Sequence, residues 1–217
     1  MEIRTYQGGF DDNLSYLIWC KETKCAAIID PSVSPTMIFE TIEDKSLKLE
    51  KILITHTHRD HWQYIDDYLY KYPLIQTVIF HKPIDNVLEN YRKVVHNEII
   101  SVGKNLLTVL HTPGHLEDSI TFWDSKNKSI FTGDTMFIGR TGRTNNPHSD
   151  ISKLYNSIYN ILLKLPKNTV IYPGHNYGFS KTTTIATNID FSPFFKCKSL
   201  NEFKAVMRNY EQNRNHK

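Results

Sequence analysis

The sequence predicts a single domain of mixed α and β structure, and two patterns carry this prediction. Short runs of β-branched and aromatic residues recur along the 217 residues, and stretches with apolar residues at helical spacing separate them. No low-complexity segment or clear linker interrupts the alternation. We therefore expect one α/β (α+β) domain over residues 1–217, with residues 183–217 as a short C-terminal helical extension.

The first elements form a hairpin and a strand–helix–strand unit. Residues 14–20 and 25–29 are apolar runs on either side of a polar turn, which predicts a hairpin. Asp30-Pro31 ends the second strand, because proline cannot donate to a strand ladder. Ser34-Pro35 provides a helix start, and the helix should end near Lys45. Residues 51–54 follow as a short buried strand.

The remaining elements follow from the same patterns. Apolar and aromatic side chains recur at helical spacing over residues 62–72, which predicts a helix. The β-branched and apolar runs predict further strands, and two amphipathic stretches predict further helices. The expected strands are 77–80, 106–110, 120–123, 129–132 and 169–172, and the expected helices are 84–91, 151–164 and 199–213.

Composition excludes several classes of protein. The net charge of +3 is too small to indicate a nucleic-acid or acidic-membrane partner, and no apolar run is long enough to span a membrane. The first residues lack the features of a signal peptide. The three cysteines form no disulfide or metal-binding framework, so we expect a cytoplasmic protein. The oligomeric state is left open.

The most informative stretch is residues 55–61, with the sequence THTHRDH, directly after the strand 51–54. Alternate side chains of an extended chain point the same way, so His56 and His58 can converge. Asp60 and His61 stand at the start of the next helical stretch. Imidazole nitrogens and carboxylate oxygens are good ligands for Zn, Fe or Mn, so this run predicts metal binding.

Three further candidate ligands follow strand ends elsewhere in the chain. His115 follows the strand that ends at 110, Asp134 the strand that ends at 132, and His175 the strand that ends at 172. Taken singly, each is more simply a hydrogen-bonded loop histidine or a turn aspartate. Ligands at the same ends of neighbouring strands converge in space, however, and four such coincidences favour one shared site.

These motifs together resemble the signature of the metallo-β-lactamase superfamily. The matching segments are residues 55–61, Pro113-Gly114-His115, the sequence TGDT at 132–135, and Pro173-Gly174-His175. The resemblance implies an αββα four-layer sandwich of two mixed β-sheets flanked by helices. It also implies three groups of ligands: His56, His58 and His115 for one metal, Asp60, His61 and His175 for a second, and Asp134 as the bridge.

A site of this kind predicts hydrolysis. Two divalent ions about 3.5 Å apart lower the pKa of a bridging water toward neutrality, and the resulting hydroxide can attack a carbonyl carbon. Asp60 can both bind metal and orient the hydroxide. We expect two Zn ions, with Fe or Mn as alternatives.

Within the superfamily, the sequence resembles in particular glyoxalase II, which cleaves thioesters of glutathione, and its relatives, including the persulfide dioxygenases. The segments FDDNLSY at 10–16 and TGR at 141–143 carry it. In these families, residues at the positions of Arg143 and Tyr177 contact glutathione, so we expect a small-molecule substrate that is possibly glutathione-derived.

The main alternative is a persulfide dioxygenase with a single Fe(II) held by His56, His115 and Asp134. A lactonase, a phosphodiesterase or nuclease, and a non-catalytic metal-binding module are less favoured.

Overall fold

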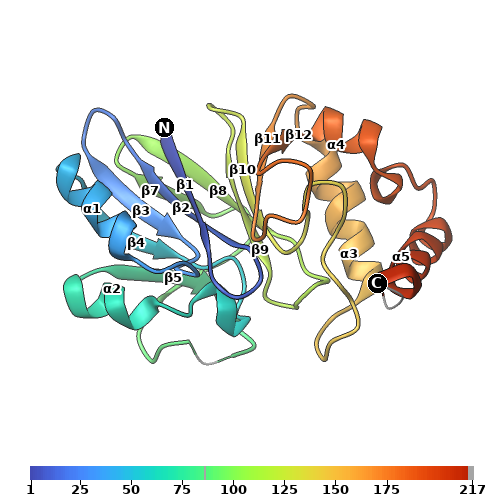
Figure 1. The fold of residues 1–217 in the computed structure, drawn as a ribbon, viewed down its shortest axis with the longest axis horizontal. Helices are drawn as coiled ribbons and strands as arrows, with labels where there is room; N and C mark the ends of the chain where they lie inside the picture. Colours follow the sequence, from blue (N-terminus) through green and yellow to red (C-terminus); the bar gives the residue numbers. More distant parts are fainter. Residues whose placement is uncertain (86, 215–217) are drawn as a thin grey trace.

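The computed structural model describes residues 1–85 and 87–214, and two six-stranded sheets packed face to face form its centre (Figure 1). The strand orders are β1-β2-β3-β4-β5-β6 and β12-β11-β10-β9-β8-β7. The strands of the first sheet are β1 Glu2–Gly8, β2 Asn13–Trp19, β3 Cys25–Ile29, β4 Lys48–Leu53, β5 Gln76–Phe80 and β6 Arg92–Val94. Those of the second are β7 Ile99–Val102, β8 Asn105–His111, β9 Ile120–Asp124, β10 Ser129–Gly133, β11 Val170–Pro173 and β12 Thr183–Thr184.

Both sheets are mixed, as expected. In the first sheet, β1, β2 and β3 pair antiparallel, whereas β3 to β6 pair parallel. In the second, β10 and β11 are the parallel pair and the other neighbours are antiparallel. Parallel neighbours end at the same edge of a sheet, so the loops after β10 and β11 emerge side by side.

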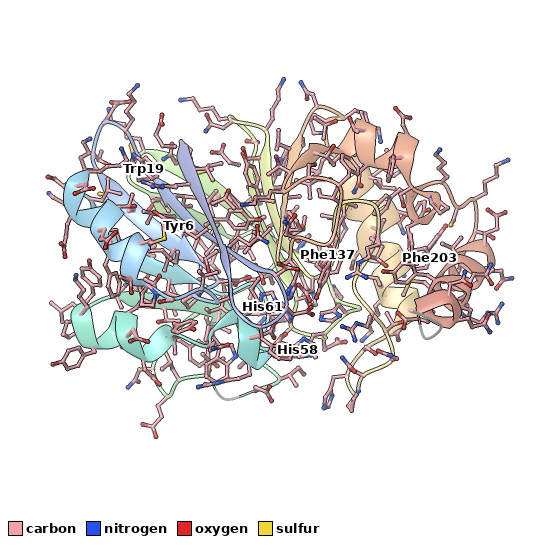
Figure 2. All side chains as sticks on the ribbon, in the orientation of Figure 1. Tyr6, Trp19, His58, His61, Phe137 and Phe203 are labelled. Carbon is pink, nitrogen blue, oxygen red and sulfur yellow. The ribbon has the colours of Figure 1, made fainter. Side chains whose placement is uncertain are left out.

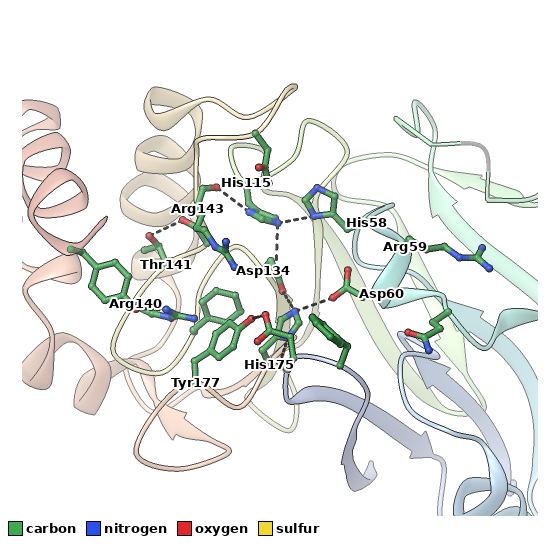
Figure 3. A pocket seen from close by; sticks show the side chains of 17 residues that line it. His58, Arg59, Asp60, His115, Asp134, Arg140, Thr141, Arg143, His175 and Tyr177 are labelled. Atoms are coloured by element: carbon green, nitrogen blue, oxygen red, sulfur yellow. Dashed lines mark hydrogen bonds and ion pairs between the residues drawn. The ribbon is translucent and has the colours of Figure 1, made fainter. Parts of the chain in front are cut away.

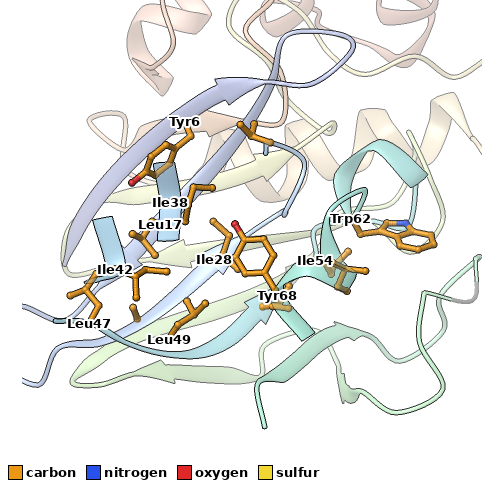
Figure 4. Packing of buried hydrophobic residues seen from close by; sticks show 14 of the residues in the cluster. Tyr6, Leu17, Ile28, Ile38, Ile42, Leu47, Leu49, Ile54, Trp62 and Tyr68 are labelled. Atoms are coloured by element: carbon orange, nitrogen blue, oxygen red, sulfur yellow. The ribbon is translucent and has the colours of Figure 1, made fainter. Parts of the chain in front are cut away.

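Helices cover the outer face of each sheet. Against the first sheet, α1 and α2 bury Ile38 and Tyr68 on Leu17 and Ile28 (Figure 4). A second apolar cluster fills the space between the sheets, where Tyr16 contacts Phe131 with ring centroids 5.3 Å apart. The helices on this side are α1 Thr36–Asp44, η1 Arg59–His61 and α2 Ile65–Lys71.

The C-terminal half of the chain covers the second sheet. Leu154 of α3 and Phe203 of α5 pack with Ile130 of β10 in a third cluster. The helices here are α3 Ile151–Asn156, which continues as η2 Ser157–Ile161 and η3 Leu162–Lys164, then α4 Ile185–Phe191, η4 Pro193–Phe195 and α5 Leu200–Arg214. The four layers confirm the αββα sandwich, while the single-domain assignment stays a prediction.

One predicted element is wrong and another starts late. Residues 84, 85 and 87–91 form no helix, and the backbone amides of Ile84 and Asp85 donate to Asp118 Oδ2 and Thr57 Oγ1, which attach this segment to the loop after β4 and the loop after β8. The helix expected from residue 62 begins at Ile65. The strands β1, β6, β7 and β12 were not predicted. Within residues 1–85 and 87–214, none of the helices combines the length and hydrophobicity that a membrane span requires.

Candidate metal centre

The seven side chains predicted as metal ligands meet at one edge of the sandwich, where four strands end. The loop after β4 carries four of them, and the loops after β8, β10 and β11 carry one each. Figure 2 places His58 and His61 in the middle of the molecule, between the two halves. The seven residues are His56, His58, Asp60, His61, His115, Asp134 and His175.

Three imidazoles form the first group of ligand atoms. The Nδ1 atom of His58 lies 3.0 Å from Nε2 of His56 and 2.9 Å from Nε2 of His115 (Figure 3). All three nitrogens fall within 4.8 Å of one another. His56 and His115 are buried, so this group is enclosed on the protein side.

Asp60, His61 and His175 form the second group. The Oδ2 atom of Asp60 lies 3.7 Å from Nε2 of His61 and 3.4 Å from Nε2 of His175. The side chain of Asp60 is 38% exposed and faces the cavity, whereas both imidazoles are buried. The carboxylate of Asp60 is therefore the part of the second group that solvent in the cavity can reach.

Asp134 lies between the groups. Its Oδ1 atom is 3.3 Å from His61 Nε2 and 3.5 Å from His175 Nε2, and its Oδ2 atom is 3.4 Å from His115 Nε2. This approach requires glycine at position 174, since a Cβ there would stand 2.4 Å from Asp134 Oδ1. The glycine of the fourth motif, Gly174, therefore leaves room for the Asp134 carboxylate.

Backbone carbonyls determine which nitrogen of two imidazoles faces the centre. His115 Nδ1 lies 3.0 Å from the carbonyl oxygen of Arg143, and His175 Nδ1 lies 2.7 Å from that of Asp11. A carbonyl only accepts, so each Nδ1 must carry the proton and donate. In the neutral form of each ring, Nε2 then carries the lone pair, which is directed at the other ligands.

Asp30 orients the imidazole of His61 in the same way, and we did not predict this role from the sequence. Its Oδ2 atom accepts from His61 Nδ1 at 2.8 Å, and its two oxygens also accept from the amide and hydroxyl of Thr55. Asp30 is buried and has a φ of 48°, a region that aspartate tolerates better than most residues. The only signal was its place before Pro31, which we interpreted as a strand end.

The donor set fits divalent cations. His61 Nε2 and Asp134 Oδ1 are buried and lack a hydrogen-bond partner among the described residues, although they face each other. In the first group, His58 Nδ1 lies close to the Nε2 atoms of both His56 and His115, and one proton can form a hydrogen bond between only one of these pairs at a time. A cation at the centre of each group accepts all the lone pairs at once, and imidazole with carboxylate suits such ions. The site therefore has the composition of a divalent-metal centre.

The electrostatics differ between the two groups. Burial lowers the pKa of His56 and His58, and it lowers the pKa of His115 to about 4, so these imidazoles are neutral at pH 7. Burial also acts to lower the pKa of His175, but Asp134 and Asp60 outweigh it and raise the pKa to about 10. Neutral imidazole is the metal-binding form, so the first group is already in that form without a cation.

A cavity of about 490 Å³ opens over the ligands. Arg143 and Tyr177, the predicted substrate contacts, both line it. The hydroxyl of Tyr177 donates to Asp11 Oδ2. Residues that the sequence analysis did not assign also line the cavity, and they are Phe10, Asp11, Arg59, Gln63, Phe137, Arg140, Thr141, Gly142, Asn146 and Tyr210.

Residues 63–175 match the family model described as the metallo-beta-lactamase superfamily. They include His115, Asp134 and His175, and they cover more than half of the chain. This chain belongs to the metallo-β-lactamase superfamily. The match agrees with the αββα architecture and with the ligand cluster at the edge of the sheets.

Several members of this superfamily are similar to this protein over most of its length. A probable hydroxyacylglutathione hydrolase, glo2 of Schizosaccharomyces pombe, is 32% identical over 96% of this chain and 78% of its own length. The hydroxyacylglutathione hydrolase GloC of Haemophilus influenzae is 34% identical over 88% of this chain and 95% of its own. The crystal structure of ETHE1 from Myxococcus xanthus superimposes with a TM-score of 0.85 at 29% identity, covering 97% of this chain and 91% of that one.

Proposed function

We propose that this protein is a metal-dependent hydrolase of the glyoxalase II type, which cleaves a small thioester of glutathione or a related thiol. Curated hydroxyacylglutathione hydrolases are 31–34% identical to most of the chain and support the reaction class. The observation that carries the proposal is the convergence of five imidazoles and two carboxylates beneath an open cavity.

In this proposal, His56, His58 and His115 hold one divalent ion and Asp60, His61 and His175 hold a second, with Asp134 between them. The proposed metal is Zn. When bound, the two ions lower the pKa of water toward neutrality and polarise the substrate carbonyl. Water adds to that carbonyl carbon, the C–S bond breaks, and the acid and the thiol leave.

Asp60 is the proposed catalytic residue among the ligands. Its Oδ2 atom faces both imidazoles of its group and also accepts from Asn13 Nδ2 at 2.9 Å. Those contacts hold the carboxylate in place, so Oδ1 is left to accept a hydrogen bond from the attacking water. A neutral amide at this position would lose that strong acceptor.

Arg143 and Tyr177 are the proposed contacts to the thiol portion of the substrate. The guanidinium of Arg143 lies at the wall of the cavity and can bind a carboxylate with two hydrogen bonds. Donation by the Tyr177 hydroxyl to the substrate requires that the hydroxyl give up its hydrogen bond to Asp11.

Elemental analysis of protein purified without added metal, followed by two assays on that sample, tests the proposal. Two Zn per chain with release of thiol from S-lactoylglutathione is the expected result. One Fe per chain with oxygen consumption on glutathione persulfide would instead favour the dioxygenase alternative.

A further inference from the structure

The loop after β10 carries a second arginine into the cavity, Arg140, and its backbone is held rigidly. The amide of Phe137 donates to the carbonyl of Arg140 at 2.8 Å, which closes a tight turn. The side chain of Asn188 spans this turn, since it donates to the carbonyl of Phe137 and accepts from the amide of Gly139. Gly139 has a φ of 83°, a conformation that favours glycine.

The side chain of Arg140 is held by two tyrosines. Its guanidinium carbon lies 3.9 Å from the ring centroid of Tyr177, and its Nη1 donates to the hydroxyl of Tyr210 in α5. Figure 3 shows Arg140 and Arg143 on the same side of the cavity. The two aromatic contacts restrict the guanidinium before any ligand arrives, which reduces the entropy lost on binding.

Arg140 has hydrogen-bonding capacity that the protein leaves unused. Within residues 1–85 and 87–214 it makes no ion pair with a carboxylate, and its Nε is buried without a hydrogen-bond partner. With Nη1 occupied, Nε and Nη2 form the remaining two-donor fork of the guanidinium, and the side chains that cover Nε must move aside for a ligand to reach it. Such a fork matches the two oxygens of a carboxylate or a phosphate.

We propose that Arg140, positioned by Tyr210, is a specificity-determining residue that binds an anionic group at the far end of the thioester. This inference rests on the proposed function. The ring of Tyr177 separates Arg140 from His175, so a group on Arg140 lies away from the carbonyl carbon that reacts. For a small acyl group, that far end is the thiol portion, and the anion is a carboxylate or a phosphate.

Two matched pairs of thioesters test the inference. One is S-acetylglutathione with its diethyl ester, and the other is S-acetyl-4′-phosphopantetheine with S-acetylpantetheine. We expect the metal-loaded enzyme to prefer the charged member of at least one pair, and Arg140→Met to lower kcat/KM for that member by on the order of 30-fold. The neutral member should change less than about threefold. The pair with the larger preference identifies the anion.

Arg208→Met is the matched control, because Arg208 is exposed on the same helix as Tyr210 and outside the cavity. It removes the same charge and should keep the preference. Arg140→Lys keeps the charge but not the fork, and Tyr210→Phe removes the acceptor of Nη1. Both should lose part of the preference while the protein stays folded.

A binding measurement separates this inference from the proposed function. S-methylglutathione and S-methyl-4′-phosphopantetheine have neither a thioester nor a free thiol. Calorimetric titration should show the Kd of at least one of them weakened on the order of 30-fold by Arg140→Met. If the enzyme cleaves no thioester, not even a neutral one, the proposed hydrolase is rejected, while these titrations still test the role of Arg140. Equal use of charged and neutral thioesters in both pairs, or unchanged binding of both compounds in Arg140→Met, would overturn the inference.

Discussion

The rings of His175 and Tyr177 stack in parallel, with centroids 4.8 Å apart and 1° between their planes. The two residues also share Asp11, whose carbonyl accepts from His175 Nδ1 and whose carboxylate accepts from the Tyr177 hydroxyl. Tyr177 therefore supports a proposed metal ligand while it lines the cavity. Different substitutions of Tyr177 can therefore change substrate binding and metal binding independently.

Two substitutions at Tyr177 should separate these roles. Tyr177→Phe keeps the stacked ring and loses only the bond to Asp11, so we expect full metal content with KM raised about 3- to 10-fold. Tyr177→Ala also removes the ring beside His175 and should lower metal content. Elemental analysis beside steady-state kinetics measures both. Equal metal content in the two variants would show that the stacking does not support the site.

Arg143→Ala should weaken substrate binding and leave the metal centre intact. The contact of Arg143 with His115 uses the backbone carbonyl, so removal of the side chain preserves it. We expect KM for S-lactoylglutathione to rise on the order of 30-fold, the loss of one charge-assisted contact. Metal content should match that of the unaltered protein. An unchanged KM would remove Arg143 from the substrate site.

Asp30→Asn should weaken the second metal group. The amide nitrogen of asparagine cannot accept. At the Oδ1 position it would leave the Thr55 amide without an acceptor, and at the Oδ2 position it would leave the Thr55 hydroxyl and His61 Nδ1 without one. We expect metal affinity to fall about 10- to 100-fold and the free energy of unfolding to fall by about 1–3 kcal/mol. Competition with a chelator and urea unfolding measure these quantities.

The control for this variant is Asp66→Asn, which neutralises an exposed carboxylate in the first turn of α2. It should retain both metal ions and the free energy of unfolding of the unaltered protein. An Asp30→Asn protein that is indistinguishable from it would show that the orientation of His61 does not depend on Asp30.

The two groups of ligands should respond differently to pH. In the metal-free protein, the pKa of His175 is raised to about 10, so a cation must displace a proton there at pH 7. Burial lowers the pKa of all three imidazoles of the first group, that of His115 to about 4, so protons compete there only below the usual pKa of imidazole. Affinity at the second group should therefore fall more steeply than affinity at the first as pH decreases from 8 to 5.5.

Calorimetric titration of Zn into metal-free protein, in buffers of different ionisation enthalpy, measures the protons released. We expect about one proton or more released with one ion at pH 7.5 and close to none with the other. Metal content after dialysis at pH 5.5 should fall from two ions toward one. Equal proton release for both ions would contradict the assignment of the groups.

The sequence by itself determined the positions of the seven candidate ligands and the layered fold. The ligands follow short apolar strands directly, and strands that run in the same direction end at the same edge of a sheet, so these patterns were sufficient to predict that the ligands meet. The same patterns failed at residues 84–91. Two side chains distant in sequence, Thr57 and Asp118, bind the start of that segment, and such long-range contacts leave no sign in the local pattern.

Only the tertiary structure decided how the ligands are oriented and what else faces the cavity. Asp30 reaches His61 across 31 positions, and Arg140 meets Tyr210 across 70. Neither pair leaves a periodicity or a spacing in the sequence. The first contact depends on how the ends of β3 and β4 lie side by side, and the second on how α5 packs near the loop after β10. Local pattern specifies which residues stand at the ends of strands, and long-range packing specifies which atoms of those residues face one another.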